Sequence, residues 1–487
     1  MLGRRPVLML CAALMVLSVT MILAGTEAMR ASWPPPQWPF SLSVPFVNRQ
    51  IPQASMWWRF LLLWEAVWSI ALICAVTSLV ATARRYASVA ALILFLQAVL
   101  LGIALQAPIP LNSDQYSYVG IAELVQQGYN PYNPPLRSEP VSAQLRQIST
   151  VWGKQHEGAA DASRRVLTRD RYGPAWTLAI AALLFPFRNT SVEVQAHLLR
   201  VFAALGTLGC SVMLWLSLRP IAWRCASLAA FALHPLIIVQ TAIDGHNDIF
   251  ALFFGLAAYA SVANKRFALA GILAALSIGT KLTFAPYLLP LVVYAAIMPG
   301  TGALLRLGTT LPGTLLITAL PFGVVRALFQ PMADARAYNP SYLFGLAESL
   351  LRRLPALQWI HADWIAQLYY AAIVILALGL AAATAFRKRI NILEAAMVFL
   401  IFSAARFEPW YAVNLVPLLL IRTAWSLPLF LGVSLAAQYL QANKFTPVYE
   451  PPFFAFIALA IVTTMLTFLV TGRAFRKTMS NPYLLRA

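Results

Sequence analysis

The sequence predicts an all-α, polytopic transmembrane protein with about fourteen membrane-spanning helices. The first observation is composition: hydrophobic residues make up 60% of the 487 residues, charged residues only 11%, and the mean hydropathy is +0.71. A soluble domain of ordinary composition carries roughly 25% charged residues. The second observation is pattern. The charges fall in short clusters between apolar runs of about 15 to 25 residues, the length that crosses a bilayer as a helix.

Fifteen apolar runs are candidate spans. They lie at 6–25, 59–82, 88–107, 173–187, 197–217, 222–242, 247–263, 267–280, 282–298, 305–325, 365–385, 391–405, 410–421, 425–440 and 452–471. The first run follows Arg4 and Arg5 and could be a cleaved signal peptide. It is longer than a signal core of about 7–15 residues, and no small-x-small cleavage site follows it. We therefore expect an uncleaved first helix.

One short run decides the topology. If all fifteen runs crossed, the two ends of the chain would lie on opposite sides and the charge bias would reverse halfway along. The run 173–187 begins with Gly-Pro and carries a second proline near its end, which suits an interfacial or re-entrant segment. With this run outside the membrane, 17 of the 36 Lys and Arg residues fall in inner loops and tails, and 15 of the 17 carboxylates fall outside. The positive-inside rule then predicts cytoplasmic N and C termini in a plasma (inner) membrane protein, with the functional carboxylates on the outer face.

The same charge distribution excludes other readings of the composition. A net charge of +19 could indicate a nucleic-acid partner, but the basic residues lie in short loops rather than on a soluble face, so we expect no nucleic acid. The four cysteines lie in or beside apolar runs, without the spacing of a metal site or a disulfide framework. We interpret them as small packing residues.

The longest polar outer segment is 108–196. Within it, 117–127 reads as a short helix ended by Gly128, and the proline-rich stretch 129–135 must be extended or turning. Asp114 lies just before this helix, at the outer end of the third apolar run. Asp114 or Ser113 could simply cap the helix. A carboxylate at the membrane boundary is also a candidate functional group, because burying it there is costly.

Lys281 lies between the short apolar runs 267–280 and 282–298. The two runs together would make about 46 Å of helix, too long for one span of about 30 Å and short for two. A lysine at such a break reaches the outer interface. It could snorkel to lipid headgroups or bind a phosphate.

Two further outer turns carry polar residues. The first holds Asp244, His246, Asn247 and Asp248, for which helix capping is the plain alternative; a metal ion there is conceivable but not indicated. The second holds Arg406, Glu408, Trp410 and Tyr411, whose aromatic pair could serve only as an interfacial anchor.

The order of the motifs resembles that of the C-type (GT-C) glycosyltransferases, and within them the bacterial mannosyltransferases that use polyprenyl-phosphate-mannose. The motifs, in chain order, are an aspartate after an early helix, a Tyr-x-Tyr helix, Gly-Tyr-Asn-Pro-Tyr (128–132), Arg-Tyr-Gly-Pro-Ala-Trp (171–176), Ala-His-Leu-Leu-Arg (196–200), His-Asn-Asp (246–248), Gly-Thr-Lys (279–281) and Phe-Glu-Pro-Trp-Tyr (407–411). The resemblance covers about 88–425. It makes 1–87 two added N-terminal helices and 426–487 added C-terminal helices with a basic tail.

The resemblance implies a role for each site residue. Asp114 falls on the catalytic aspartate of the family's first outer loop, which acts as the general base. Lys281 and Arg200, with Arg406, fall near the phosphate of the sugar donor. The residues expected to bind sugar or acceptor are Tyr116, Tyr118, Tyr132, His246, Asn247, Asp248, Glu408 and Trp410. Many family members carry a second acidic residue beside the catalytic one, whereas here its neighbours are Ser113 and Gln115.

The implied reaction moves a sugar, mannose, from a polyprenyl-phosphate donor to a glycolipid or glycan acceptor at the lipid surface, with inversion and with no cofactor required. One alternative is a transporter or lipid flippase, which would place ionisable groups near the bilayer midplane. Only Glu65 lies clearly inside a run, and we find no internal repeat. The other alternative is a polysaccharide polymerase or ligase with a similar outer loop.

Overall fold

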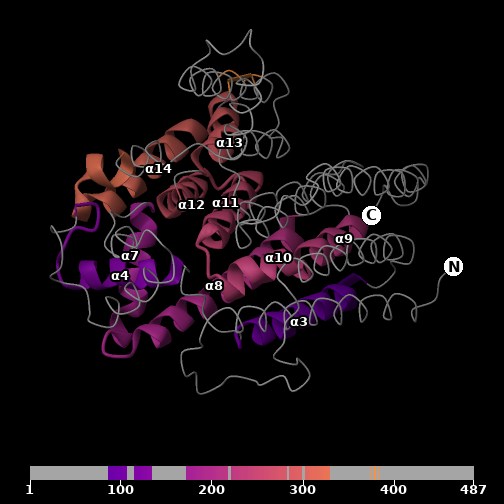
Figure 1. The fold of residues 1–487 in the computed structure, drawn as a ribbon. Helices are drawn as coiled ribbons and strands as arrows, with labels where there is room; N and C mark the ends of the chain where they lie inside the picture. Colours follow the sequence, from indigo (N-terminus) through magenta and orange to yellow (C-terminus); the bar gives the residue numbers. More distant parts are fainter. Residues whose placement is uncertain are drawn as a thin grey trace, which may run out of the picture. The chain divides into compact units, whose positions relative to one another are not determined.

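In the computed structural model, the described residues are 86–106, 114–133, 172–217, 221–281, 284–298 and 302–329, with single positions at 375, 378, 379 and 382. Within these residues every regular element is a helix and there is no strand, which confirms the all-α prediction for this part of the chain. The elements are α3 (Tyr86–Ala104), α4 (Asp114–Gln126), α7 (Pro174–Leu184), η2 (Phe185–Phe187), α8 (Val192–Ser217), α9 (Ile221–Ala232), α10 (Pro235–Ile238), η3 (Val239–Ile243), α11 (Asp248–Ala263), α12 (Phe267–Thr280), α13 (Ala285–Ile297), α14 (Ala303–Ala319) and η5 (Leu320–Phe322) (Figure 1).

The chain divides into two compact units, and the division differs from the predicted segments. Unit 1 comprises Met1–Pro110, Arg200–His246 and Glu408–Ala487, and unit 2 comprises Leu111–Leu199 and Asn247–Phe407. The predicted boundaries of the core, at 88 and 425, lie outside the described residues and stay predictions.

In unit 1, α3 packs against α9 and the buried Ser211 hydroxyl donates a 2.7 Å hydrogen bond to the side-chain oxygen of Gln97. The predicted run 222–242 is not one straight helix. It breaks after α9, restarts as α10 at Pro235, and ends in the π-helical turn η3. Proline removes a backbone hydrogen bond and clashes with the preceding turn, which explains the break. Wider π turns of this kind often occur at functional sites.

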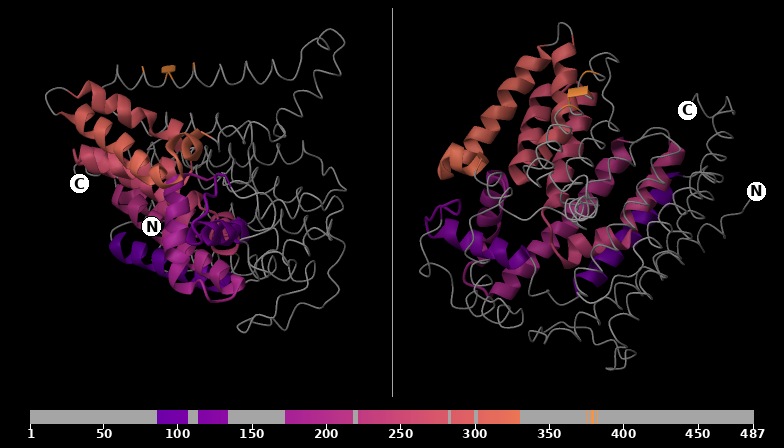
Figure 2. Two further views of the ribbon diagram at one scale, coloured as in Figure 1. Left: turned by 90° about the vertical axis from the view of Figure 1, so that its left-hand side faces the viewer. Right: turned by 45° about the horizontal axis from the view of Figure 1, so that its top comes forward.

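In unit 2, α11 and α12 form an antiparallel hairpin whose tight turn contains Lys265 at a φ of 58°. On its other side α12 packs against α14, so that α11, α12 and α14 lie side by side (Figure 2). Small residues allow the close approach: the Thr310 hydroxyl donates to the carbonyl of Ala268 at 3.0 Å, and a Cβ on Gly271 would overlap Thr310. The Ser277 hydroxyl similarly donates to the carbonyl of Ala251 at 2.7 Å.

The outer segment of unit 2 is built on α4 and α7, which pack against each other. The Gln126 side chain donates to the carbonyl of Ala181 at 2.9 Å, and the Asn130 side chain donates to the carbonyl of Phe322 at 2.7 Å. Tyr132 is buried, and its hydroxyl donates to the carbonyl of Tyr172 at 2.9 Å. These bonds tie the turn after α4 to both α7 and η5.

Two of the described helical stretches, Val192–Leu216 and Ala303–Phe322, are long and apolar enough to cross a membrane. The count of about fourteen spans extends beyond the described residues and stays a prediction. The short run 173–187 forms α7 and η2; α7 has 11 residues and is about 17 Å long, less than the roughly 30 Å of a bilayer core. Its placement at the membrane surface stays a prediction.

Candidate active site

Asp114 is the first residue of α4, so this helix begins three residues earlier than the sequence predicts. The half-buried carboxylate therefore belongs to the first helical turn, where the helix dipole favours negative charge. The helix ends as expected: Gly128 adopts a φ of 83°, a left-handed conformation that glycine tolerates and that stops the helix. Asp114 is thus held on a regular element rather than on a loop.

Two buried tyrosines lie beside Asp114. Tyr118 follows one turn later on the same helix face, and its ring contacts that of Tyr172 edge to face, with the centroids 4.9 Å apart. Burial raises the pKa of the Tyr172 phenol well above its usual value, and the Asp114 carboxylate, which is hydrogen-bonded to that phenol, raises the pKa further. Both causes keep Tyr172 a neutral hydroxyl group.

Tyr118 lies within the electrostatic reach of two carboxylates. Burial is the main cause that raises its pKa, followed by the negative charges of Asp114 and of Asp248. The Tyr118 hydroxyl is completely buried, and no group meets full hydrogen-bond geometry with it, although the Tyr172 hydroxyl and the backbone N–H of Asn247 lie close enough to oppose part of the shift in pKa. The structure therefore brings Asp114 and Asp248 to the surroundings of one phenol.

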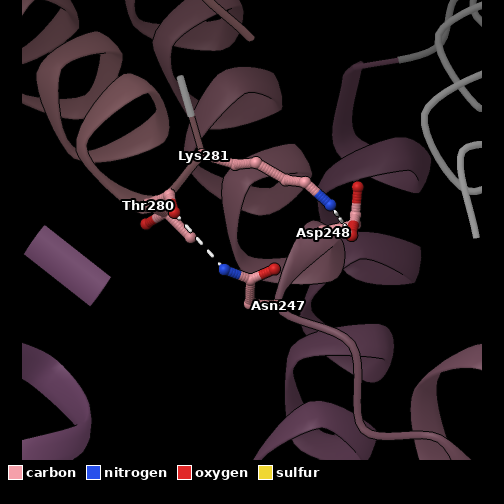
Figure 3. A network of polar contacts seen from close by, with 4 residues as sticks. All are labelled: Asn247, Asp248, Thr280 and Lys281. Carbon is pink, nitrogen blue, oxygen red and sulfur yellow. Dashed lines mark hydrogen bonds and ion pairs between the residues drawn. The ribbon is translucent and has the colours of Figure 1, made fainter. Parts of the chain in front are cut away.

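Lys281 is paired with Asp248. The lysine follows the last residue of α12 in an extended conformation, and its Nζ lies 2.5 Å from Oδ2 of Asp248, the first residue of α11 (Figure 3). The Asp248 side chain is 0% exposed and the Lys281 side chain 13%. A carboxylate buried to this degree depends on its partner, because an unpaired buried charge is strongly destabilising.

A second contact lies beside the ion pair. The Asn247 side-chain nitrogen donates to the carbonyl of Thr280 at 3.3 Å, so neighbouring residues at the start of α11 hold neighbouring residues at the end of α12 (Figure 3). The same carbonyl accepts the backbone N–H of Gly173 at 3.3 Å. A carbonyl in the last turn of a helix lacks an intrahelical partner, and here two donors from other segments supply one.

Gly173 and Gly279 permit this arrangement. A Cβ on Gly173 would collide with the carbonyl group of Gly279, and a Cβ on Gly279 would lie 2.8 Å from the Cβ of Ala175. The close approach sets the start of α7 directly on the end of α12. Three residues on from Gly173, the Trp176 ring stacks between Tyr118 and Phe250, with centroid distances of 5.2 Å to each. One packed cluster therefore connects α4, α7, α11 and α12.

Other predicted site residues have different surroundings. Arg200 is 1% exposed and belongs to unit 1, where its Nε donates to the carbonyl of Ala242 at 2.7 Å and its Nη2 to the carbonyl of Ala104 at 2.8 Å. These bonds occupy the guanidinium with backbone carbonyls. The buried His246 also belongs to unit 1, and its backbone N–H donates to Gln240.

The remaining predicted residues divide into buried and undescribed ones. Tyr116 is buried in α4, and the hydroxyl of Tyr132 is held by Tyr172 and by Thr177. Arg406, Glu408 and Trp410 lie outside the described residues. Among the described residues, no group of three His, Cys, Asp or Glu side chains is placed to hold a metal ion.

The sequence analysis assigned no role to Tyr172, Gly173, Trp176 or Thr280. All but Thr280 lie in the Arg-Tyr-Gly-Pro-Ala-Trp motif, whose glycine directly before a helix-starting proline was the available signal. The contact that gives this glycine its role is with a residue 106 positions away and could not be read from the motif.

An all-helical chain with apolar helices, and with a carboxylate and a lysine–carboxylate pair gathered in one unit, fits the class of membrane-embedded GT-C glycosyltransferases. Residues 10–298 match the family described as "Alpha-(1->6)-mannopyranosyltransferase, N-terminal domain". The match covers more than half of the chain, and the chain belongs to this family. No curated protein and no solved structure matches the chain at a significant level. Family membership confirms the resemblance to mannosyltransferases and makes the chain a glycosyltransferase.

Proposed function

We propose that the protein transfers a mannosyl group from a polyprenyl-phosphate donor to a hydroxyl of a lipid-linked or polysaccharide acceptor, on the outer face of the membrane. One observation carries the proposal: Asp114 and the Asp248–Lys281 pair both lie around Tyr118. A carboxylate that can accept a proton and a lysine that can bind a phosphate are therefore held on one packed cluster. This arrangement suits a substrate in which a sugar separates the reacting hydroxyl from the phosphate.

Asp114 is the proposed general base. The acceptor oxygen attacks C1 of the mannosyl group on the face opposite the phosphate, its proton passes to the Asp114 carboxylate, and the C1–O bond to the phosphate breaks with its electron pair going to the phosphate oxygen. One displacement inverts the anomeric centre. A positioned base contributes roughly 10²–10⁴-fold to the rate. The neutral Tyr172 hydroxyl, which is hydrogen-bonded to Asp114, supports the carboxylate in its working position.

Lys281 is the proposed binding group for the donor phosphate. Negative charge grows on the leaving phosphate during the reaction, and a fixed cation stabilises that charge without rearranging. Asp248 and Asn247 supply the fixation, because they hold Lys281 and Thr280 respectively. Arg200 has a different proposed role: its bonds to Ala104 and Ala242 support a structural function in unit 1. The proposed step requires no cofactor.

The test is transfer by the purified protein in lipid nanodiscs. Radiolabelled polyprenyl-phosphate-mannose is supplied with a mannose-terminated glycolipid, and polyprenyl-phosphate-glucose serves as the matched donor control. We expect label in the glycolipid from the mannose donor, and NMR of the product should show the inverted anomer. Absence of transfer from every polyprenyl-phosphate sugar, or retention of the anomeric configuration, would reject the proposal.

A further inference from the structure

The Asp248–Lys281 pair forms without any ligand and carries no net charge. Lys281 is partly accessible at 13% exposure, whereas Asp248 is completely enclosed and has been removed from water by the packing of α11. A phosphate that reaches Lys281 therefore meets a cation that a buried carboxylate has already neutralised. Asp114 adds a second carboxylate to the surroundings of the same cluster.

The proposed reaction changes the charge of the phosphate that Lys281 would bind. The sugar donor is a phosphodiester with a single negative charge. The departing polyprenyl phosphate is a monoester, and a phosphate monoester carries about −1.5 to −2 at neutral pH. The product is therefore more negative than the substrate at the same position.

We infer that Asp248 determines which phosphate charge the Lys281 site accepts, favouring the monoanionic donor over the more highly charged monoester product and so promoting product release. The inference rests on the proposed function, in which Lys281 binds the donor phosphate. Asp248 acts here as a specificity-determining residue: it does not bind the phosphate, and it sets the net charge that the phosphate meets.

The physical basis is the fixed position of Asp248. A bare lysine attracts a dianion more strongly than a monoanion, because the Coulomb energy grows with the charge. A carboxylate in contact with the lysine cancels most of that increase. Asp248 cannot turn away to relieve the repulsion, since it is the first residue of a packed helix and is wholly buried. The second negative charge of the product is therefore not rewarded by tighter binding.

A purely structural role for the pair makes a different prediction. The open end of the α11–α12 hairpin is also tied by the bond from Asn247 to Thr280, so Asp248 is not its single anchor among the described residues. If Asp248 only placed Lys281, its substitution would weaken every phosphate ligand by a similar factor. The inference instead predicts a change in the ratio between two ligands.

The experiment compares two probes of equal chain length, a short polyprenyl phosphate and its methyl diester, binding to the full-length protein in nanodiscs at pH 7.5. The wild-type protein is expected to bind the methyl diester at least as tightly as the monoester. Asp248→Asn should tighten binding of the monoester relative to the diester by about tenfold, because one buried negative charge has been removed. Tighter wild-type binding of the monoester, or an unchanged ratio in Asp248→Asn, would overturn the inference.

Three variants separate the causes. Asp248→Glu keeps the charge and should keep the wild-type ratio. Glu123→Gln removes a carboxylate nine residues along α4 from Asp114, about 13 Å along the helix, and should also leave the ratio unchanged. Lys281→Met should weaken binding of both probes. If the wild-type protein binds neither probe, or Lys281→Met weakens neither, the proposed role of Lys281 itself is rejected. If Asp248→Asn does not fold, the wild-type ratio still decides the question.

Discussion

Gly173 lies so close to the carbonyl group of Gly279 that no side chain fits between them. This contact joins the start of α7, which carries Tyr172 beside Asp114, to the end of α12, which carries Lys281. The proposed base and the proposed phosphate-binding lysine are therefore connected through two glycines that lie far apart in the sequence.

The glycine contact can be tested by adding one methyl group. Gly173→Ala should collide with Gly279 and separate α7 from α12, and overpacking of this kind costs about 1–3 kcal/mol. We expect a lower melting temperature and at least a roughly tenfold loss of mannosyl transfer, since misplacing a catalytic group by about 1 Å can cost 10²-fold. Gly308→Ala is the matched control: it lies in α14 with nothing within 4 Å of its added Cβ, so stability should stay the same or rise. Equal behaviour of the two variants would contradict the role of the contact.

The proposed base can be tested by removing its ability to accept a proton. Asp114→Asn keeps the size of the side chain, so donor binding should be nearly unchanged. Turnover should fall by at least about 10²-fold, the lower end of what a positioned base supplies. The two quantities are measured by single-turnover kinetics and donor binding, with Glu123→Gln on the same helix as control. Near-wild-type turnover in Asp114→Asn would move the search for the base to another outer carboxylate, Asp244, Asp248 or Glu408.

The ion pair predicts a separation of stability from binding. Lys281→Met leaves Asp248 buried without its partner, which should cost about 3–5 kcal/mol of stability, and it should also weaken donor binding. The double variant Lys281→Met, Asp248→Asn removes both charges and should regain most of the stability but none of the donor affinity. Thermal unfolding and a donor-binding assay measure the two effects. Recovery of donor affinity in the double variant would show that Lys281 does not bind the phosphate.

Arg200 should behave as a structural residue. Arg200→Met removes two charged hydrogen bonds to the carbonyls of Ala104 and Ala242, each worth roughly 1.5–3 kcal/mol. The melting temperature should therefore fall, while the fraction that remains folded keeps wild-type affinity for the sugar donor. Loss of donor affinity with an unchanged melting temperature would instead support the phosphate-binding role that the family resemblance implies.

The predicted topology can be tested at the two ends of the α11–α12 hairpin. Lys265, in the turn, lies at the end opposite to Asp248 and Lys281. In a protein lacking its natural cysteines, Lys265→Cys should react with an impermeant thiol reagent only after the membrane is opened. Arg188→Cys, in the exposed segment that follows η2, should react from outside in intact cells. Labelling of position 265 from outside would reverse the orientation of the hairpin.

The sequence by itself determined the class of the protein and the candidate positions of its charged groups. Long apolar runs predict helices directly, because each helix satisfies its own backbone hydrogen bonds. The break at Lys281 and the short helix after Asp114 were predicted for the same reason: prolines, glycines and isolated charges act on their local backbone. The predicted boundaries differed from the observed ones where a tertiary contact extends or interrupts a helix, as in the three additional residues of α4 and the break before Pro235.

Only the tertiary structure decided which charges meet. Asp248 and Lys281 are 33 residues apart, and Arg200 finds its carbonyl partners 42 and 96 residues away. Asp248 was predicted as a sugar-binding residue, whereas the fold pairs it with Lys281; Arg200 was predicted beside a phosphate, whereas the fold surrounds it with backbone carbonyls. A side chain reports its own charge and hydrogen-bonding capacity through the sequence. Its partner depends on which helix ends are packed together, and small residues such as Gly173 and Gly279 control that packing through contacts that no local pattern encodes.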